Sequence, residues 1–327
     1  MTRILTLLIL AAVAGSCAAD QQTRVLRLSH GLDTGHPVHL GMVRMAELLA
    51  EKSGGDLTIS IYPNQQLGTE RQSLELLQIG SLSMTKVSAA VLENFSPEAT
   101  VLSLPYLFRS REHVYDFEDS PLGREILISS EPFRLRGLVY FDAGQRSFYT
   151  KDRPVRTPED LRGQKIRVQQ SATAIEMVKA LGGSPTPISY GELYTALQQG
   201  VVDGAENNPP SFYTSRHYEV CKYYTLDEHT AVPDVLIIGT EAWERLDPQQ
   251  QAWLQEAADE AVVYQRKLWQ EAEQEALDAV AAAGVEIIRP EKGPFIEQTA
   301  SILEAYRDDP VIYSLIERII AMAPHEE

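Results

Sequence analysis

The chain has 327 residues, which can bury a sizeable core and exceed what one hydrophobic core usually holds, so we expect two domains. Its formal net charge of −17 disfavours nucleic acid and anionic membrane surfaces as partners, because both would repel it. A small anionic ligand is compatible with this charge, since a local arginine pocket can overcome a negative overall field.

The first residues have the layout of a secretory signal. A basic start precedes an apolar run, and small residues surround Cys17. We expect a signal peptide over 1–19 and an exported mature protein, with cleavage after Ala19 or with Cys17 as the lipidated first residue of a lipoprotein. Outside this signal only Cys221 remains, so no internal disulfide is possible and a buried thiol is expected.

The mature chain opens with alternating strands and helices. Apolar patterns predict strands over 23–30 and 57–63 and helices over 40–55 and 69–80, with glycine at both helix ends. A longer helical segment is expected after Pro121, ahead of another apolar strand. This alternation indicates an α/β architecture.

A second set of elements begins at Thr157, where TPEDL places a capping threonine before a proline that starts a helix. A strand over 165–169 and a helix over 171–181 follow. The next helical segment, SYGELYTALQQG, has the spacing of a capping box formed by Ser189 and Glu192. These signals define element boundaries and are silent on function.

The strand KIRVQ has two different faces. Because strand side chains alternate, Arg167 and Gln169 lie on one face and Ile166 and Val168 on the other. Arg167 is therefore a candidate for binding an anion.

A polar but periodic segment runs from Asp247 to Gly284 without a helix breaker. Its length of roughly 35 residues exceeds the usual globular helix. The scattered alanines give no sustained heptad pattern, so we expect a helix lying across two domains rather than a coiled coil.

Common catalytic motifs are absent: the sequence has no G-x-S-x-G, H-E-x-x-H, Walker loop, G-x-G-x-x-G or C-x-x-C. His36 with His39, or His217 with Cys221, could in principle bind a metal, but each pair lacks an obvious third ligand. We therefore expect no metal, no cofactor and no enzyme activity. His36 could also donate a hydrogen bond to a ligand.

The segment GVVDGAENNPP, 200–210, is expected to be a loop between a helix end and two prolines. Its acids Asp203 and Glu206 could form a general acid/base pair. Hydrogen bonding of this segment to ligand hydroxyls is the interpretation we prefer.

Four segments together resemble one known family over nearly the whole mature chain. They are YPNQQLGTER at 62–71, LPYLFRS at 104–110, TPEDLRGQKIRVQ at 157–169 and SPTPISYGELYTALQQGVVDGAENNP at 184–209. The sequence is similar to the substrate-binding proteins of tripartite ATP-independent periplasmic (TRAP) transporters. This resemblance implies a two-domain α/β flytrap whose cleft closes over an organic acid, with a long helix crossing both domains.

The resemblance also implies ligand-binding residues. The arginine of the family's K-[IL]-R-V strand, which pairs bidentately with the ligand carboxylate, corresponds to Arg167. The second family arginine corresponds to Arg146, and the ligand-contacting asparagine to Asn207. Tyr190 matches an aromatic cleft residue and Glu70 an acidic residue that can accept from hydroxyls, with a packed aromatic and a helix-start acid as the alternatives.

The sequence departs from the sialic acid branch of the family, because Lys86 and Ser88 stand where that branch has an aromatic residue and a glutamate. Segments such as RVQQS and AENNPPSFY look closest to relatives that bind hexuronates, for example glucuronate or galacturonate. Lys86 and Arg71 would add positive charge near the site, unless they are solvated at the surface. Tyr190 and Tyr213 are candidates for stacking on a pyranose ring.

The function that the resemblance implies is binding without chemistry, by a periplasmic solute-binding subunit that delivers a small carboxylate ligand to small and large TRAP membrane subunits. A monomer is expected. A ligand-sensing protein that presents its closed form to a receptor, or a sugar-acid-processing enzyme, are the alternatives. We expect domain I to comprise 24–143 plus 232–271, and domain II to comprise 144–231 plus 272–327.

Overall fold

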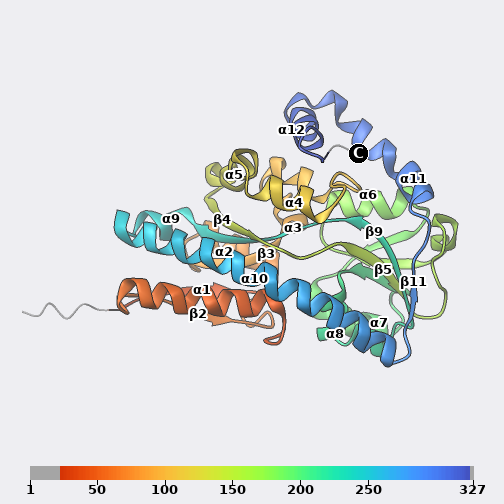
Figure 1. Ribbon diagram of the computed structural model, residues 1–327, viewed down its shortest axis with the longest axis horizontal. Helices are drawn as coiled ribbons and strands as arrows, with labels where there is room; N and C mark the ends of the chain where they lie inside the picture. The colour runs from red at the N-terminus through yellow and green to blue at the C-terminus, as the bar shows by residue number, and fades with distance from the viewer. Residues whose placement is uncertain (1–22, 325–327) are drawn as a thin grey trace, which may run out of the picture.

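The computed structural model describes residues 23–324. It contains two β-sheets flanked by helices, which form two lobes side by side (Figure 1). No helix within the described range is both long and apolar enough to cross a membrane. The predicted signal peptide, 1–19, and the candidate lipidation site Cys17 lie outside the described residues.

The first lobe is built on a five-stranded sheet with the order β2-β1-β3-β10-β4. Strand β1 is parallel to β2 and β3, whereas β10 is antiparallel to both of its neighbours. The strands are β1 (Arg24–Ser29), β2 (Leu57–Tyr62), β3 (Met84–Ser88), β4 (Leu135–Phe141) and β10 (Asp234–Gly239). The helices of this part of the chain are α1 (Pro37–Ser53), α2 (Glu70–Gln78), α3 (Ala89–Leu92), η1 (Pro97–Ser103), α4 (Arg111–Glu118), α5 (Pro121–Ile128), η2 (Glu131–Phe133) and α9 (Thr240–Glu244).

Apolar layers cover both faces of the first sheet. On one face α1 packs against α10 (Pro248–Ala282), where Met42 and Trp269 are fully buried. On the other face α2 to α5 and the last helix, α12 (Pro310–Ile320), surround Phe117. Burying a large apolar side chain of this kind contributes roughly 1.5–3 kcal/mol relative to exposure. Packing on both faces therefore holds the first sheet, and with it the sheet edge that faces the other lobe, in one position.

The second lobe is built on a six-stranded sheet with the order β11-β9-β5-β8-β6-β7. Strand β5 is antiparallel to β8 and β9, and β6 is parallel to β7 and β8. The strands are β5 (Arg146–Thr150), β6 (Lys165–Val168), β7 (Ser184–Pro187), β8 (Gly204–Asn207), β9 (Tyr223–Thr230) and β11 (Glu286–Ile288). The helices are η3 (Pro158–Leu161), α6 (Ala172–Ala180), η4 (Tyr190–Glu192), α7 (Leu193–Gln198), α8 (Pro209–Thr214), η5 (His217–Glu219), α11 (Gly293–Glu304) and η6 (Ala305–Asp308).

The core of the second lobe also has two layers. One contains Tyr149, Phe212 and Cys221, and the other contains Ile166 together with Phe295 of α11. Burial raises the pKa of the Cys221 thiol well above its usual range, so the thiol stays protonated. The expected buried cysteine is confirmed.

Helix α10 joins the two lobes. It spans 35 residues and begins with a capping box in which Asp247 and Gln250 bond to each other's backbone N–H groups. It contacts α1 in the first lobe and α8 in the second (Figure 1). The predicted long helix across both lobes is confirmed, and the chain also crosses between the sheets from β4 to β5 and from β9 to β10.

The predicted domain limits, 24–143 plus 232–271 and 144–231 plus 272–327, stay a prediction. The division of strands between the two sheets agrees with these limits, since β10 lies in the first sheet and β11 in the second. Helix α12, which falls within the second predicted domain, packs its apolar face into the core beside the first sheet.

Three local expectations differ from the structure. Helix α5 after Pro121 is short, because Pro132 follows closely and cannot continue a helix. The capping box at Ser189 and Glu192 does not form; the Ser189 hydroxyl bonds to the Glu192 carboxylate, and no side chain caps that helix end. The segment 200–210 is not only a loop, since it contains strand β8.

Candidate functional site

A cavity lies between the facing edges of the two sheets, and both lobes line it. Its polar residues lie at strand ends and helix starts. Strands β3 and β8 end at the cavity, and strands β5 and β10 begin there. Polar lining residues of the first lobe are Gln65, Thr69, Glu70, Arg71, Lys86, Ser88 and Asp234. Polar lining residues of the second lobe include Arg146, Arg167, Gln169, Tyr190 and Asn207.

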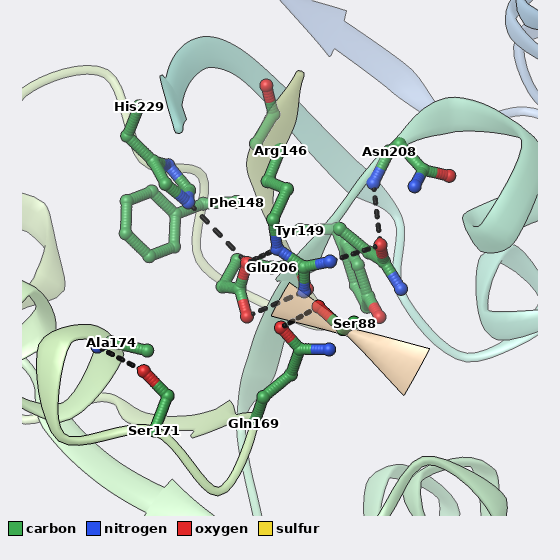
Figure 2. Close-up of polar contacts among 12 residues, drawn as sticks. Ser88, Arg146, Phe148, Tyr149, Gln169, Ser171, Ala174, Glu206, Asn208 and His229 are labelled. Atoms are coloured by element: carbon green, nitrogen blue, oxygen red, sulfur yellow. Dashed lines mark hydrogen bonds and ion pairs between the residues drawn. The ribbon is translucent and has the colours of Figure 1, made fainter. Parts of the chain in front are cut away.

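Arg146, the first residue of β5, is held in place by the neighbouring strand β8 (Figure 2). Its Nε and Nη2 donate to the Glu206 carboxylate, and Nη1 donates to Asn207 Oδ1 at 2.8 Å. Nη2 also donates to the Glu206 carbonyl at 2.9 Å. Because this buried guanidinium is already paired, its charge is compensated within the protein.

His229 extends this network and approaches the Glu206 carboxylate oxygen that also accepts from Arg146 Nε (Figure 2). Its Nδ1 donates to Asp227 Oδ2 at 2.7 Å, and its Nε2 lies 3.6 Å from Glu206 Oε2. Burial disfavours the charged ring, but the two carboxylates outweigh burial and raise the pKa of His229 to about 9. Burial likewise disfavours the Glu206 carboxylate, yet Arg146 and His229 lower the pKa of Glu206 to about 2.

Arg167 differs from the other buried cations of the cavity. Its Nε donates to the Ile188 carbonyl at 2.9 Å, which ties the guanidinium to the segment directly after the neighbouring strand β7. Its Nη1 is buried and has no hydrogen-bond partner among residues 23–324, and within that range no carboxylate lies at ion-pair distance. A buried cationic donor without a partner is costly, so this guanidinium is poised to bind an anion.

Lys86 is compensated by two carboxylates of its own lobe. Its Nζ lies 3.0 Å from Glu70 Oε1 and 3.1 Å from Asp234 Oδ1, and the side chain is almost completely buried. Burial disfavours the ammonium, but Asp234 and Glu70 outweigh burial and raise the pKa of Lys86 above its usual range. The lysine therefore stays charged while its charge is more than balanced.

The two lobes touch across the cavity. Ser88 Oγ of the first lobe donates to Gln169 Oε1 of the second at 3.2 Å (Figure 2). Next to the cavity, the Thr173 N–H at the start of α6 donates to Glu93 Oε1 at 3.2 Å. These hydrogen bonds join residues that would separate if the lobes moved apart.

His36 and Tyr213 are not brought to the cavity, unlike the other predicted ligand-binding residues. His36 is buried at the start of α1, where Nδ1 accepts from the Val38 N–H and Nε2 therefore donates to Ser211 Oγ at 3.1 Å. Tyr213 lies on the exposed side of α8 and stacks on Tyr218. Both side chains make local contacts and lie outside the cavity lining.

Three residues within the cavity have surroundings that the sequence did not indicate. Arg146 corresponds to the second ligand-binding arginine of the family, but four of its five N–H donors bond to Glu206 and Asn207. Lys86 was expected to add positive charge, but two carboxylates offset it. Arg71 lines the rim, where its exposed side chain pairs with Glu75.

Asp234 and Ser211 line the cavity without having been predicted, whereas Asn208 belongs to the segment 200–210 that was expected to hydrogen-bond to a ligand. Asp234 begins a wholly buried strand directly after a proline, and an acid at such a position is a signal that could have identified it. Asn208 caps α8 by accepting from the Ser211 N–H, and this capping pattern gave no separate sign that Ser211 lines the cavity.

The arrangement can hold a polar anion. Among the described residues, no group of three or more His, Cys, Asp or Glu side chains could hold a metal ion. The cavity instead combines one uncompensated guanidinium with carboxylate, amide and hydroxyl groups on both walls. Such a set of donors and acceptors suits a small molecule that carries both a carboxylate and hydroxyl groups.

Comparisons with known proteins agree with this geometry. Residues 28–309 match the family described as bacterial extracellular solute-binding protein, family 7. The chain is 40% identical over 297 residues to the uncharacterised protein YiiZ of Salmonella typhimurium, covering 90% of each chain. A TRAP periplasmic solute-binding protein from Bradyrhizobium, in complex with α/β-D-galacturonate, has a TM-score of 0.89 and 41% identity, with 91% of this chain and 100% of that one covered. A similar protein from Pseudomonas putida F1, with bound D-glucuronate, has a TM-score of 0.88 and 36% identity, with 93% and 98% covered.

Proposed function

The chain belongs to the bacterial extracellular solute-binding proteins of family 7, and we propose that it captures a hexuronate, such as glucuronate or galacturonate, for a TRAP transporter. The family places it outside the cytoplasm as a transport protein. The signal peptide over 1–19 and delivery to a small and a large membrane subunit are part of the proposal.

The observation that carries this proposal is the buried Nη1 of Arg167, which has no hydrogen-bond partner among the described residues. A planar guanidinium presents parallel N–H donors that match the two oxygens of a carboxylate. Nη1 is buried without a protein partner, while the other buried cations of the cavity, Lys86 and Arg146, are paired with carboxylates. A ligand carboxylate on Arg167 would satisfy this donor and neutralise the charge.

The hexuronate is supported by the chemistry of the lining and by the similar proteins with bound galacturonate and glucuronate. A hexuronate carries one carboxylate and several hydroxyls. Gln169, Asn207, Ser88 and Tyr190 offer amide and hydroxyl groups around Arg167, and the Tyr190 ring offers an apolar face for a pyranose.

The proposed mechanism is binding followed by closure, with no catalytic step. A ligand favours the closed form only through contacts that are stronger there than in the open form, so it must touch both lobes. Here Arg167 belongs to the second lobe and Glu70 to the first. We place the hinge at the crossings β4 to β5 and β9 to β10, so that domain I comprises 24–143 plus 232–271 and domain II comprises 144–231 plus 272–327.

The test is calorimetric titration of the mature protein with D-glucuronate and D-galacturonate, beside Arg167→Ala and Arg167→Lys. Two charge-assisted hydrogen bonds contribute roughly 1.5–3 kcal/mol each, so Arg167→Ala should raise Kd at least about a hundredfold. Arg167→Lys should recover only part of this loss, because lysine keeps the charge without the planar donors. Arg162→Ala, an exposed arginine of the same lobe, is the matched control and should leave Kd unchanged.

Two results would contradict the proposal. Tight hexuronate binding that persists in Arg167→Ala would contradict the proposal that Arg167 binds the ligand carboxylate. Any copurified ligand is first removed by unfolding and refolding. If the protein then binds neither hexuronate, the proposal that its ligand is a hexuronate is wrong.

A further inference from the structure

Glu70, Lys86 and Asp234, here called the acidic trio, form the wall of the cavity that lies on the first lobe. Asp234 pairs with Ser88 in the β3–β10 register, which brings Lys86 and Asp234 to the same end of the sheet. Glu70, at the start of α2, reaches both strands: Oε1 accepts from Lys86 Nζ and Oε2 accepts from the Ser88 N–H at 3.3 Å. Arg167 stands on the other wall, in the second lobe.

The acidic trio has more acceptor capacity than it uses. Two carboxylates offer about eight lone-pair positions, and the hydrogen bonds from Lys86 and Ser88 use a minority of them. The ammonium of Lys86 has three N–H donors, of which Glu70 and Asp234 take two. The acidic trio itself therefore offers several free acceptors and one free donor.

Hydroxyl groups fit such a wall and a carboxylate does not. A hydroxyl can donate to the free carboxylate oxygens and accept from the remaining N–H of Lys86. An ionised carboxylate can only accept, so it would face Glu70 and Asp234 with one donor between them. Like charges brought together in a buried site are strongly unfavourable.

The charges on the two walls are opposite. Two carboxylates and one ammonium give the acidic trio a formal charge of −1. On the other wall Glu206 compensates Arg146, which leaves the +1 charge of Arg167. Burial raises the pKa of Asp234 while Lys86 opposes this, and the ammonium of Lys86 is retained.

Resting on the proposed function, we propose that the acidic trio determines specificity: it reads the hydroxyls of a sugar acid with one carboxylate and rejects sugar acids that carry a second one. Arg167 alone would accept either kind of acid. The first-lobe wall then distinguishes a hexuronate from the corresponding aldarate, in which the far end of the same six-carbon chain is also a carboxylate.

The test compares D-glucuronate with D-glucarate by calorimetric titration of the mature protein. The native protein should bind D-glucarate at least about a hundredfold more weakly, because its second carboxylate meets the acidic trio. In Glu70→Gln, which removes one negative charge at nearly constant size, the ratio of the two Kd values should fall at least about tenfold. The exposed Glu47→Gln on α1 is the matched control and should keep the native ratio.

D-Glucuronate is cyclic and D-glucarate is linear, and this difference in shape affects the ratio of their Kd values in every variant alike. A change in the ratio between variants therefore reports the change in charge. If Glu70→Gln does not fold, Asp234→Asn removes the other carboxylate charge and carries the same expectation. Equal binding of both acids by the native protein would overturn the inference while leaving hexuronate capture intact. A native preference that is unchanged in both variants would also overturn it, because selectivity would then arise elsewhere in the cavity. Failure to bind either acid would contradict the proposed function, and this inference with it.

Discussion

Replacing His229 by glutamine should remove a pH-dependent part of the protein's stability. The ring is completely buried, yet Asp227 and Glu206 hold it in the charged form and raise the pKa of His229 from 6.5 to about 9. Glutamine keeps a donor toward Asp227 but cannot titrate. The variant therefore separates the effect of the proton from the effect of the side-chain volume.

The size and sign of the effect follow from this shift. Each pKa unit corresponds to about 1.36 kcal/mol, so the shift from 6.5 to about 9 amounts to about 3 kcal/mol. The folded protein holds a proton that the unfolded chain releases more readily. The stabilisation is therefore fully present below pH 6.5 and is lost as the pH rises through 9.

The assay is urea unfolding of the native protein and His229→Gln at pH 6, 7, 8 and 9, with the difference in unfolding free energy taken at each pH. This difference should shrink by about 3 kcal/mol across the series. His113→Gln is the control, because the buried His113 ring hydrogen-bonds to two uncharged backbone groups, the Arg109 N–H and the Ile319 carbonyl. A difference for His229→Gln that stays constant with pH would refute the charged histidine.

Two further predictions concern the framework of the site and use thermal unfolding. Gly204→Ala should destabilise the protein by about 1–3 kcal/mol, because the new Cβ would lie 2.4 Å from the Tyr149 carbonyl, and backbone cannot yield easily. Gly293→Ala, where nothing lies within 4 Å, should be nearly neutral, and equal Tm losses would contradict this steric reasoning. Trp269→Ala should cost about 3–5 kcal/mol, since this α10 side chain is fully buried against the first sheet. Val263→Ala on the same helix, where the side chain is 73% exposed, should stay within about 0.5 kcal/mol, and a similar loss in both would contradict the packing of α10.

The succession of elements could be predicted because local signals mark most of it. Gly54 ends α1 in the left-handed conformation with φ 60°, and Asp247 caps α10. Strand β3 escaped prediction because MTKVS has a lysine in a strand that is buried throughout. A charge at that position is tolerated only because Glu70 and Asp234 pair with it. The strand depends on partners that the local sequence does not contain.

The site could be predicted in part for the same reason. Arg167 was indicated by the alternation of a short strand and by the resemblance to a known family. The structure places it in the cavity, where none of the described residues forms an ion pair with it. The compensation of the other cations could not be predicted, because Lys86 and Asp234 are 148 positions apart and Arg146 and Glu206 are 60 apart. Which carboxylate meets which cation depends on the order of strands in each sheet.

Under the proposed function, this compensation would let an acidic protein select among small anions. Three uncompensated cations in one cavity would attract any multiply charged anion and would repel one another as the lobes approach. With Arg146 and Lys86 balanced by carboxylates of their own lobes, each wall forms a stable unit before the cleft closes. Among the three cavity cations Lys86, Arg146 and Arg167, Arg167 is then the one whose charge a bound anion would compensate. A monocarboxylate whose carboxylate binds Arg167 and whose hydroxyls bond to the acidic trio contacts both lobes. These contacts, made only in the closed form, are what stabilises that form.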